Sequence, residues 1–106
     1  MSEGTFVQGD TAPDITVTLY QSDGTTPLDL TDSTVKFQMR KADDRKFTVD
    51  ASADVDTDPT TGKVSYRWSV GDLAVPGDYQ AQWEVTYNDG RIQTTATPNE
   101  ISVRRQ

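Results

Sequence analysis

Apolar and polar residues alternate with a period of two along most of the chain. In residues 15–19, the three apolar side chains are on one side of an extended chain and the two threonines are on the other. The same alternation recurs in residues 34–40, 47–55, 64–68, 79–87, 91–97 and 101–103. No segment has apolar residues at the spacing of a helix face. The pattern predicts about seven short strands, each with one buried and one wet face.

Turn residues separate these stretches. Residues 58–62 read DPTTG, in which the proline presets φ and Gly62 suits the left-handed position before the chain returns. Residues 88–90 read NDG and mark a second tight turn. Pro98-Asn99 interrupts the last alternating stretch, which implies an edge position or a bulge there. We therefore expect hairpins at the first two sites and an irregular last strand.

The length and the spacing of the strands favour one small domain. The chain has 106 residues, of which 33% are hydrophobic. These apolar residues are concentrated at the inward positions of the predicted strands, which is typical of a thin core between two sheets. We expect a single β-sandwich domain over residues 1–106, with its core between about residues 6 and 103.

Two residue types that carry much of enzyme chemistry are missing. The sequence contains no cysteine and no histidine. No disulfide can form, and the most common zinc ligands and the most common general base are absent. Cysteine-based and Ser-His-Asp mechanisms are excluded. We expect a protein that is not an enzyme and that holds no cofactor or metal.

The charge restricts the partners. The net charge is −7, which repels nucleic acid phosphates and anionic lipid. No stretch approaches the length of a membrane-spanning helix, and the residues after Met1 lack the basic and apolar regions of a signal peptide. We expect synthesis in the cytoplasm and no nucleic-acid or membrane partner.

Residues 73–81, LAVPGDYQA, resemble the approach to the sixth strand of immunoglobulin-like domains. In those domains a buried tyrosine returns its hydroxyl to the backbone just upstream and forms a tyrosine corner. Gly77 and Tyr79 have the matching spacing, and Ala81 is where antibody domains have a cysteine. The alternative is an ordinary strand entry with a buried tyrosine. We expect an all-β, immunoglobulin-like antiparallel sandwich of about seven strands without a disulfide.

Two tryptophans have two possible roles. Exposed Trp68 and Trp83 would be stacking platforms for sugars or bases. Both are in phase with the inward apolar residues of their strands, as Phe37 is in its own strand. We therefore expect all three to pack in the core.

Three aspartates at alternate positions suggest a calcium loop. Asp54, Asp56 and Asp58 supply hard oxygen ligands at a plausible spacing. An EF-hand needs glycine at its sixth position and an acidic residue at its twelfth, where this chain has Pro59 and Ser65. We expect these carboxylates to solvate a strand end instead.

Residues 40–46 read RKADDRK and form a charged connection. The opposite charges nearly cancel, whereas nucleic-acid binding needs a larger basic stripe. A solvated loop tip is the default interpretation, and an electrostatic docking point is the alternative.

The order of motifs along nearly the whole chain resembles a known family. The motifs are FVQGDTAP at 6–13, VKFQMR at 35–40, DPTTGKV at 58–64, PGDY at 76–79 and WEVTYNDGR at 83–91. Together they look like the immunoglobulin-like domain at the N-terminus of phage baseplate upper proteins. The resemblance implies a structural role in which the domain attaches a component to the phage particle, often in many symmetric copies. It implies no catalytic residues.

In such proteins the chain usually continues into further segments, whereas this sequence stops shortly after its last strand. That difference leaves room for a free-standing accessory protein on the tail, baseplate, head-tail junction or capsid.

Our first hypothesis is a phage virion structural protein that docks on other virion proteins, with a symmetric multimer in the particle as an open alternative. The second is a carbohydrate- or host-cell-surface-binding module, which would need an exposed aromatic patch or a calcium site. For docking, exposed strand edges are the expected contacts. The residues predicted to provide them are Phe6, Val7 and Gln8 near the start, and Ile101, Val103 and Arg104 in the last strand.

Overall fold

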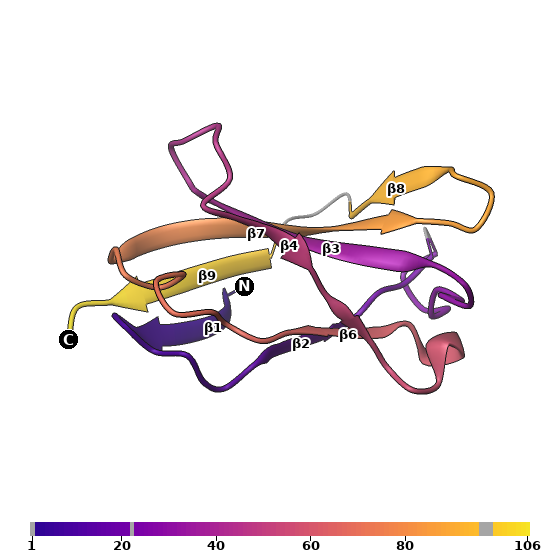
Figure 1. Cartoon of the computed structure of the whole chain (residues 1–106), viewed down its shortest axis with the longest axis horizontal. Coiled ribbons are helices and arrows are strands. Elements are labelled where there is room, and N and C mark those ends of the chain that lie inside the picture. Colours follow the sequence, from indigo (N-terminus) through magenta and orange to yellow (C-terminus); the bar gives the residue numbers. More distant parts are fainter. Residues whose placement is uncertain (1, 22, 96–98) are drawn as a thin grey trace.

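The structure, a computed structural model, describes residues 2–21, 23–95 and 99–106. These residues form nine strands and one short 3-10 helix (Figure 1). The elements are β1 (Ser2–Val7), β2 (Ile15–Thr18), β3 (Thr34–Lys41), β4 (Val49–Ser52), β5 (Asp54–Val55), η1 (Pro59–Thr61), β6 (Lys63–Tyr66), β7 (Gly77–Thr86), β8 (Ile92–Thr94) and β9 (Asn99–Arg104).

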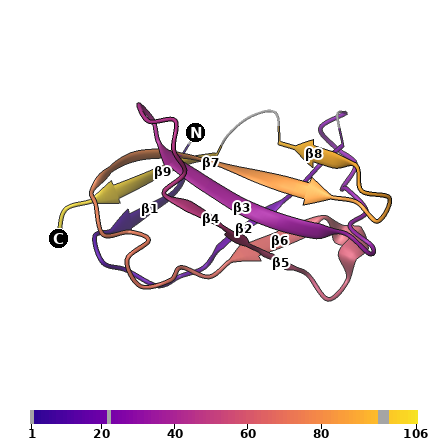
Figure 2. The ribbon, with the colours of Figure 1, turned by 45° about the horizontal axis from the view of Figure 1, so that its top comes forward.

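The strands form two sheets. The larger has the order β1-β9-β7-β3-β4, with β8 pairing on β7, and the smaller has the order β2-β6-β5. Figure 2 shows the two sheets as two layers of the ribbon. The division of the strands into β2-β6-β5 and β4-β3-β7-β9 corresponds to the two sheets of an immunoglobulin-like sandwich. The prediction of an all-β, immunoglobulin-like fold without a disulfide is confirmed.

Two predicted strands are each divided in the structure. The expected strand at residues 47–55 changes sheets: β4 pairs with β3, whereas β5 pairs with β6. The change follows Ala53, whose N–H still donates to the carbonyl of Val35 at 2.8 Å. The last stretch is divided into β8 and β9, which pair with the two halves of β7. Residues 96–98, including the proline expected to interrupt this stretch, are outside the described residues.

One pairing departs from the expected antiparallel sandwich. Strand β1 runs parallel to β9, with Phe6 opposite Val103. Every other ladder between the described strands is antiparallel. The first strand is therefore the outermost strand of the larger sheet and lies next to the last strand, instead of pairing with β2.

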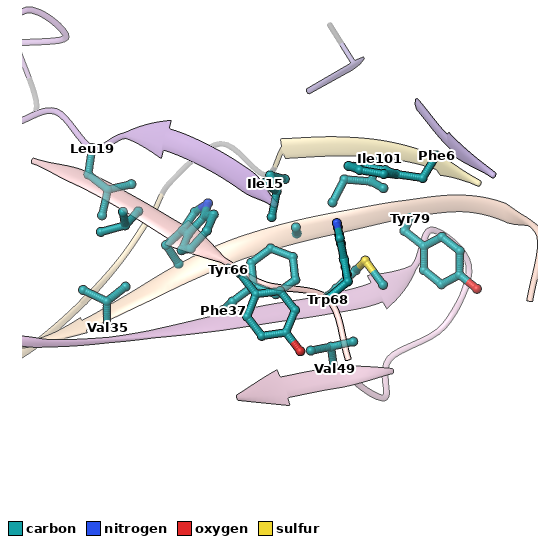
Figure 3. Packing of buried hydrophobic residues seen from close by; sticks show 14 of the residues in the cluster. Phe6, Ile15, Leu19, Val35, Phe37, Val49, Tyr66, Trp68, Tyr79 and Ile101 are labelled. Atoms are coloured by element: carbon teal, nitrogen blue, oxygen red, sulfur yellow. The ribbon is translucent and has the colours of Figure 1, made fainter. Parts of the chain in front are cut away.

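An aromatic cluster fills the core. Phe37 on β3 is fully buried, stacks on Tyr66 at a centroid distance of 4.6 Å and packs edge-on against Trp68 at 5.5 Å (Figure 3). The ring centroid of Trp83, on the neighbouring β7, lies 4.9 Å from that of Phe37. Such pairs each add about 0.5–1.5 kcal/mol beyond the burial of apolar area. These contacts join the two sheets in the absence of a disulfide.

The predicted hairpin at residues 58–62 is present and joins β5 to β6. Asp58 accepts a hydrogen bond from the N–H of Thr60 at the start of η1, and Gly62 ends it at φ 71°. A Cβ on Gly62 would lie 2.5 Å from the carbonyl oxygen of Leu19. Glycine is therefore required both by the left-handed conformation and by the close approach of the segment after β2.

Candidate interaction edges

Tyr79 forms the corner expected from its sequence context. Its ring is buried, and its hydroxyl donates to the carbonyl of Val75 at 2.6 Å. Burial raises the pKa of the Tyr79 hydroxyl above its usual value. Gly77 begins β7 at φ 145°, where a Cβ would contact the Lys41 side chain at 3.5 Å. The corner fixes the crossover between the two sheets at one end of the molecule.

Both tryptophans are inside the sandwich. Trp83 is fully buried and Trp68 is 3% exposed. Trp68 makes edge contacts with Phe6, Phe37 and Tyr66, and its Nε1 has no hydrogen-bond partner within the described part of the chain. Neither indole offers a stacking platform at the surface, so neither tryptophan supplies the aromatic patch that the glycan-binding alternative needs.

Strand β1 is one outer edge of the larger sheet. Gln8 donates its N–H to the carbonyl of Arg104 at 2.8 Å, so Gln8 and Phe6 direct their main-chain groups toward β9. Val7 and Thr5 direct theirs away from the sheet. The N–H of Val7 is bound by a carboxylate oxygen of Asp10 at 3.0 Å, and its carbonyl accepts from the N–H of Asp10 at 2.9 Å. Thr5 is left with unpaired outward groups among the described residues.

The last strand is not a free edge, and that prediction is wrong. β9 pairs with β1 on one side and with β7 on the other. Ile101 and Val103 are buried in the core, as is Phe6. Period-two alternation identified these side chains as inward-facing, but the position of a strand within its sheet depends on distant partners. Of the residues predicted at edges, Val7, Gln8 and Arg104 remain accessible.

The opposite side of the sandwich is acidic. β4 and β5 are the outer strands there, and this side carries Asp50, Asp54, Asp56 and Asp58. Asp50 accepts from the amide of Gln38, and Asp58 accepts from the hydroxyl and the N–H of Thr60. Among the described residues, no three potential metal-ligating side chains are grouped to hold an ion. We name this region the β4–β5 side, and the region formed by β1 and β2 the β1–β2 side.

Aspartates also hold the surface turns. Asp23 accepts from the main chain of Thr25 and from the hydroxyl and main chain of Thr26, and these bonds lower the pKa of its carboxyl to about 2. The hydroxyl of Thr31 lowers the pKa of Asp29 in the same way. The hydrogen bonds to these carboxylates fix the geometry of the two loops.

Tyr66 joins the core to the crossover loop. Its hydroxyl donates to Asp72 at 2.6 Å, and the same carboxylate oxygen accepts from the N–H of Ser69. Burial, together with the hydrogen bond to Asp72, raises the pKa of Tyr66 to about 12.

Sequence reasoning missed the roles of Asp10 and Asp72. A signal was available in both places, because each aspartate follows a glycine in a turn. Asp10 is three residues after Val7, and Asp72 is three residues after Ser69.

Two surface hollows lie beside charged side chains. One of about 540 Å³ lies beside the link from β1 to β2, where Asp14 and Arg67 approach to 3.9 Å. Another of about 360 Å³ lies on the outer face of β7 and β9, with Asp78 and Glu100 in its lining. In the 40–46 connection, Arg40 donates to the carbonyl of Asp44 at the loop tip. No helix within the described residues is long and apolar enough to cross a membrane.

Comparisons with known proteins found two solved structures that are similar to this chain. No curated protein matches the sequence. The solved structure of CopC from Methylosinus trichosporium OB3b is similar with a TM-score of 0.57 at 12% identity, over 100% of this chain and 87% of that chain, which indicates a shared fold only. Murine CRIg gives a TM-score of 0.39 at 15% identity, over 98% of this chain and 92% of that chain.

The family model described as the BppU N-terminal domain matches residues 3–101. That range includes all strands except the end of β9 and the first residue of β1. The resemblance seen in the motifs is thereby confirmed, and this chain belongs to the family of N-terminal domains of phage baseplate upper proteins, a family of baseplate-associated structural proteins.

Proposed function

We propose that this protein is a structural component of the bacteriophage virion, an immunoglobulin-like module that docks on other virion proteins. The observation that carries the proposal is the family match over residues 3–101. Its partners are proteins of the tail or baseplate, the head-tail junction or the capsid surface. It is made in the host cytoplasm, is incorporated into the particle and performs no catalysis.

The β1–β2 side is the docking surface in this proposal. Thr5 presents unpaired main-chain groups on the edge of the larger sheet, and Val7, 39% exposed, adds an apolar contact beside it. Gln8 binds the carbonyl of Ala74 through its side chain, which ties the end of β1 to the crossover loop. A partner strand or loop gains main-chain hydrogen bonds at such an edge without displacing any bond of the fold.

A proline at Thr5 tests this edge. Because the N–H of Thr5 points away from β9, Thr5→Pro removes an outward donor and leaves the ladder to β9 in place. The matched control is Ser52→Pro on β4, whose main chain also faces outward because Ala51 and Ala53 face β3. We expect incorporation into purified particles, measured by quantitative mass spectrometry, to fall about tenfold or more for Thr5→Pro and to stay near wild type for Ser52→Pro.

Two results would contradict the proposal. Particles that lack the wild-type protein altogether would refute the virion role. Equal incorporation of both variants, at matched melting temperatures, would refute docking through β1 but would leave the virion role standing.

A further inference from the structure

Strand β2 is a second open edge on the same side of the molecule (Figure 1). Leu19 donates its N–H to the carbonyl of Gly62, and the register pairs Val17 with Val64, so the odd-numbered residues direct their main chain toward β6. The main-chain groups of Thr16 and Thr18 therefore face outward. Neither residue has a partner for these groups within the described part of the chain.

Three of the other outer strands carry features that limit pairing, whereas the three-residue β8 has neither a charge nor a proline. On β1, Asp10 occupies the outward N–H of Val7. On the opposite side, β5 displays Asp54, and β4 displays Asp50. Charged side chains and blocked donors are common devices by which proteins prevent edge-to-edge association. The strand Ile15–Thr18 has neither a charge nor a proline, so its edge is open to another strand.

The sequence around β2 is complementary to itself. In an antiparallel pair of two copies centred on Val17, each Thr16 would be opposite Thr18 of the second copy, and their outward groups would exchange main-chain hydrogen bonds. The same register places Asp14 opposite Tyr20 of the second copy, so no like charges meet. Opposed threonines are favourable cross-strand pairs. We propose that two copies of this chain associate through β2, forming one continuous six-stranded sheet from the two smaller sheets.

This association goes beyond the proposed docking role and uses a different strand. The contact is short, since β2 has four residues, and it falls in the class of small, weak interfaces. We expect a Kd on the order of 100 µM for the isolated protein. Copies held next to one another in a particle would pair far more readily, because their effective concentration is high.

Paired charge variants test the register. In Thr16→Lys/Thr18→Glu, each lysine would be opposite a glutamate of the second copy, whereas in Thr16→Lys/Thr18→Lys lysine would be opposite lysine. Sedimentation equilibrium up to about 1 mM should show the first variant dimerising at least as tightly as wild type and the second at least about fivefold more weakly. Amide exchange by NMR should show protection of Thr16 and Thr18 that increases with protein concentration.

Each other outcome overturns the proposal. A wild-type protein that stays monomeric at the highest concentration, two variants with equal affinity, or protection that grows at Thr5 but not at Thr16 would each exclude a β2 dimer. Saturable binding of an extended peptide at β2 without self-association would assign this edge to a different protein. Matched amide spectra of both variants establish that they are folded. Because Thr5→Pro leaves β2 intact, failure of the β1 docking test and failure of this test are distinguishable.

Discussion

The two sides of the sandwich end their sheets in opposite ways. On the β4–β5 side, four aspartates line the outer strands and the adjoining turn. On the β1–β2 side, the residues with open main-chain groups are threonines, and the one aspartate that caps β1 is in the following turn. Both sides have the same core behind them. The difference indicates that one side is protected from association and that the other is left available for it.

The largest expected effect comes from the residue that joins the two sides. Gly62 ends the hairpin of the β4–β5 side and lies against Leu19, just after β2. Gly62→Ala should lower the free energy of unfolding by about 2 kcal/mol or more, because it adds a clash with a backbone oxygen to the cost of positive φ. Gly90→Ala is the control, since Gly90 has φ 89° but no atom within 4 Å of an added Cβ. It should cost about 1 kcal/mol in urea denaturation. Equal losses would show that the contact between the two sides is unimportant.

The next effect concerns the strand between the two sides. Tyr66 on β6 pairs with Ile15 of β2, and its pKa is raised to about 12 in the folded protein. The unfolded tyrosine ionises near its ordinary pKa of 10.0, so the unfolded state loses its proton first as pH rises. This contribution to stability is fully present below pH 10 and is lost as pH rises to about 12.

Denaturation between these pH values measures the effect. Tyr66→Phe should flatten the decline in stability, with a residual slope from Tyr79, whose pKa is also raised by burial. If the free energy of unfolding of Tyr66→Phe fell with pH as steeply as that of the wild type, the decline would not be due to Tyr66.

The smallest effect on stability should come from the acidic side. Asp54→Asn/Asp56→Asn removes charge from the outer edge of the smaller sheet and should change the free energy of unfolding by less than about 0.5 kcal/mol. It should nevertheless increase self-association, seen as greater light scattering at high protein concentration. Asp43→Asn/Asp44→Asn, in the β3–β4 loop, removes the same charge away from any sheet edge. Equal scattering from both variants would mean that net charge, and not the protection of a sheet edge, prevents self-association.

Local patterns predicted the interior better than the borders of the sheets. Alternation alone placed Phe37, Trp68 and Trp83 in the core, and a short motif placed the Tyr79 corner, because both features depend on neighbouring residues. The change of sheet after Ala53 and the pairing of β9 between β1 and β7 were not predictable in this way. Each depends on which distant strand supplies the partner, and an alternating sequence fits several partners equally well.

The free edges were hardest to predict for the same reason. Thr16 and Thr18 were expected only as the wet face of a strand, and nothing nearby in the sequence states that β2 has a single neighbour. Asp10 was not expected to cap Val7, because a turn aspartate has many possible acceptor roles.

Hydrogen–deuterium exchange of the protein in assembled particles, compared with the free protein, tests the central claim most directly. If the domain is a virion component that associates through the β1–β2 side, residues 5–8 and 14–20 gain protection in the particle, whereas residues 49–58 exchange as in the free protein. Protection confined to residues 49–58, with the β1–β2 side unchanged, would contradict it.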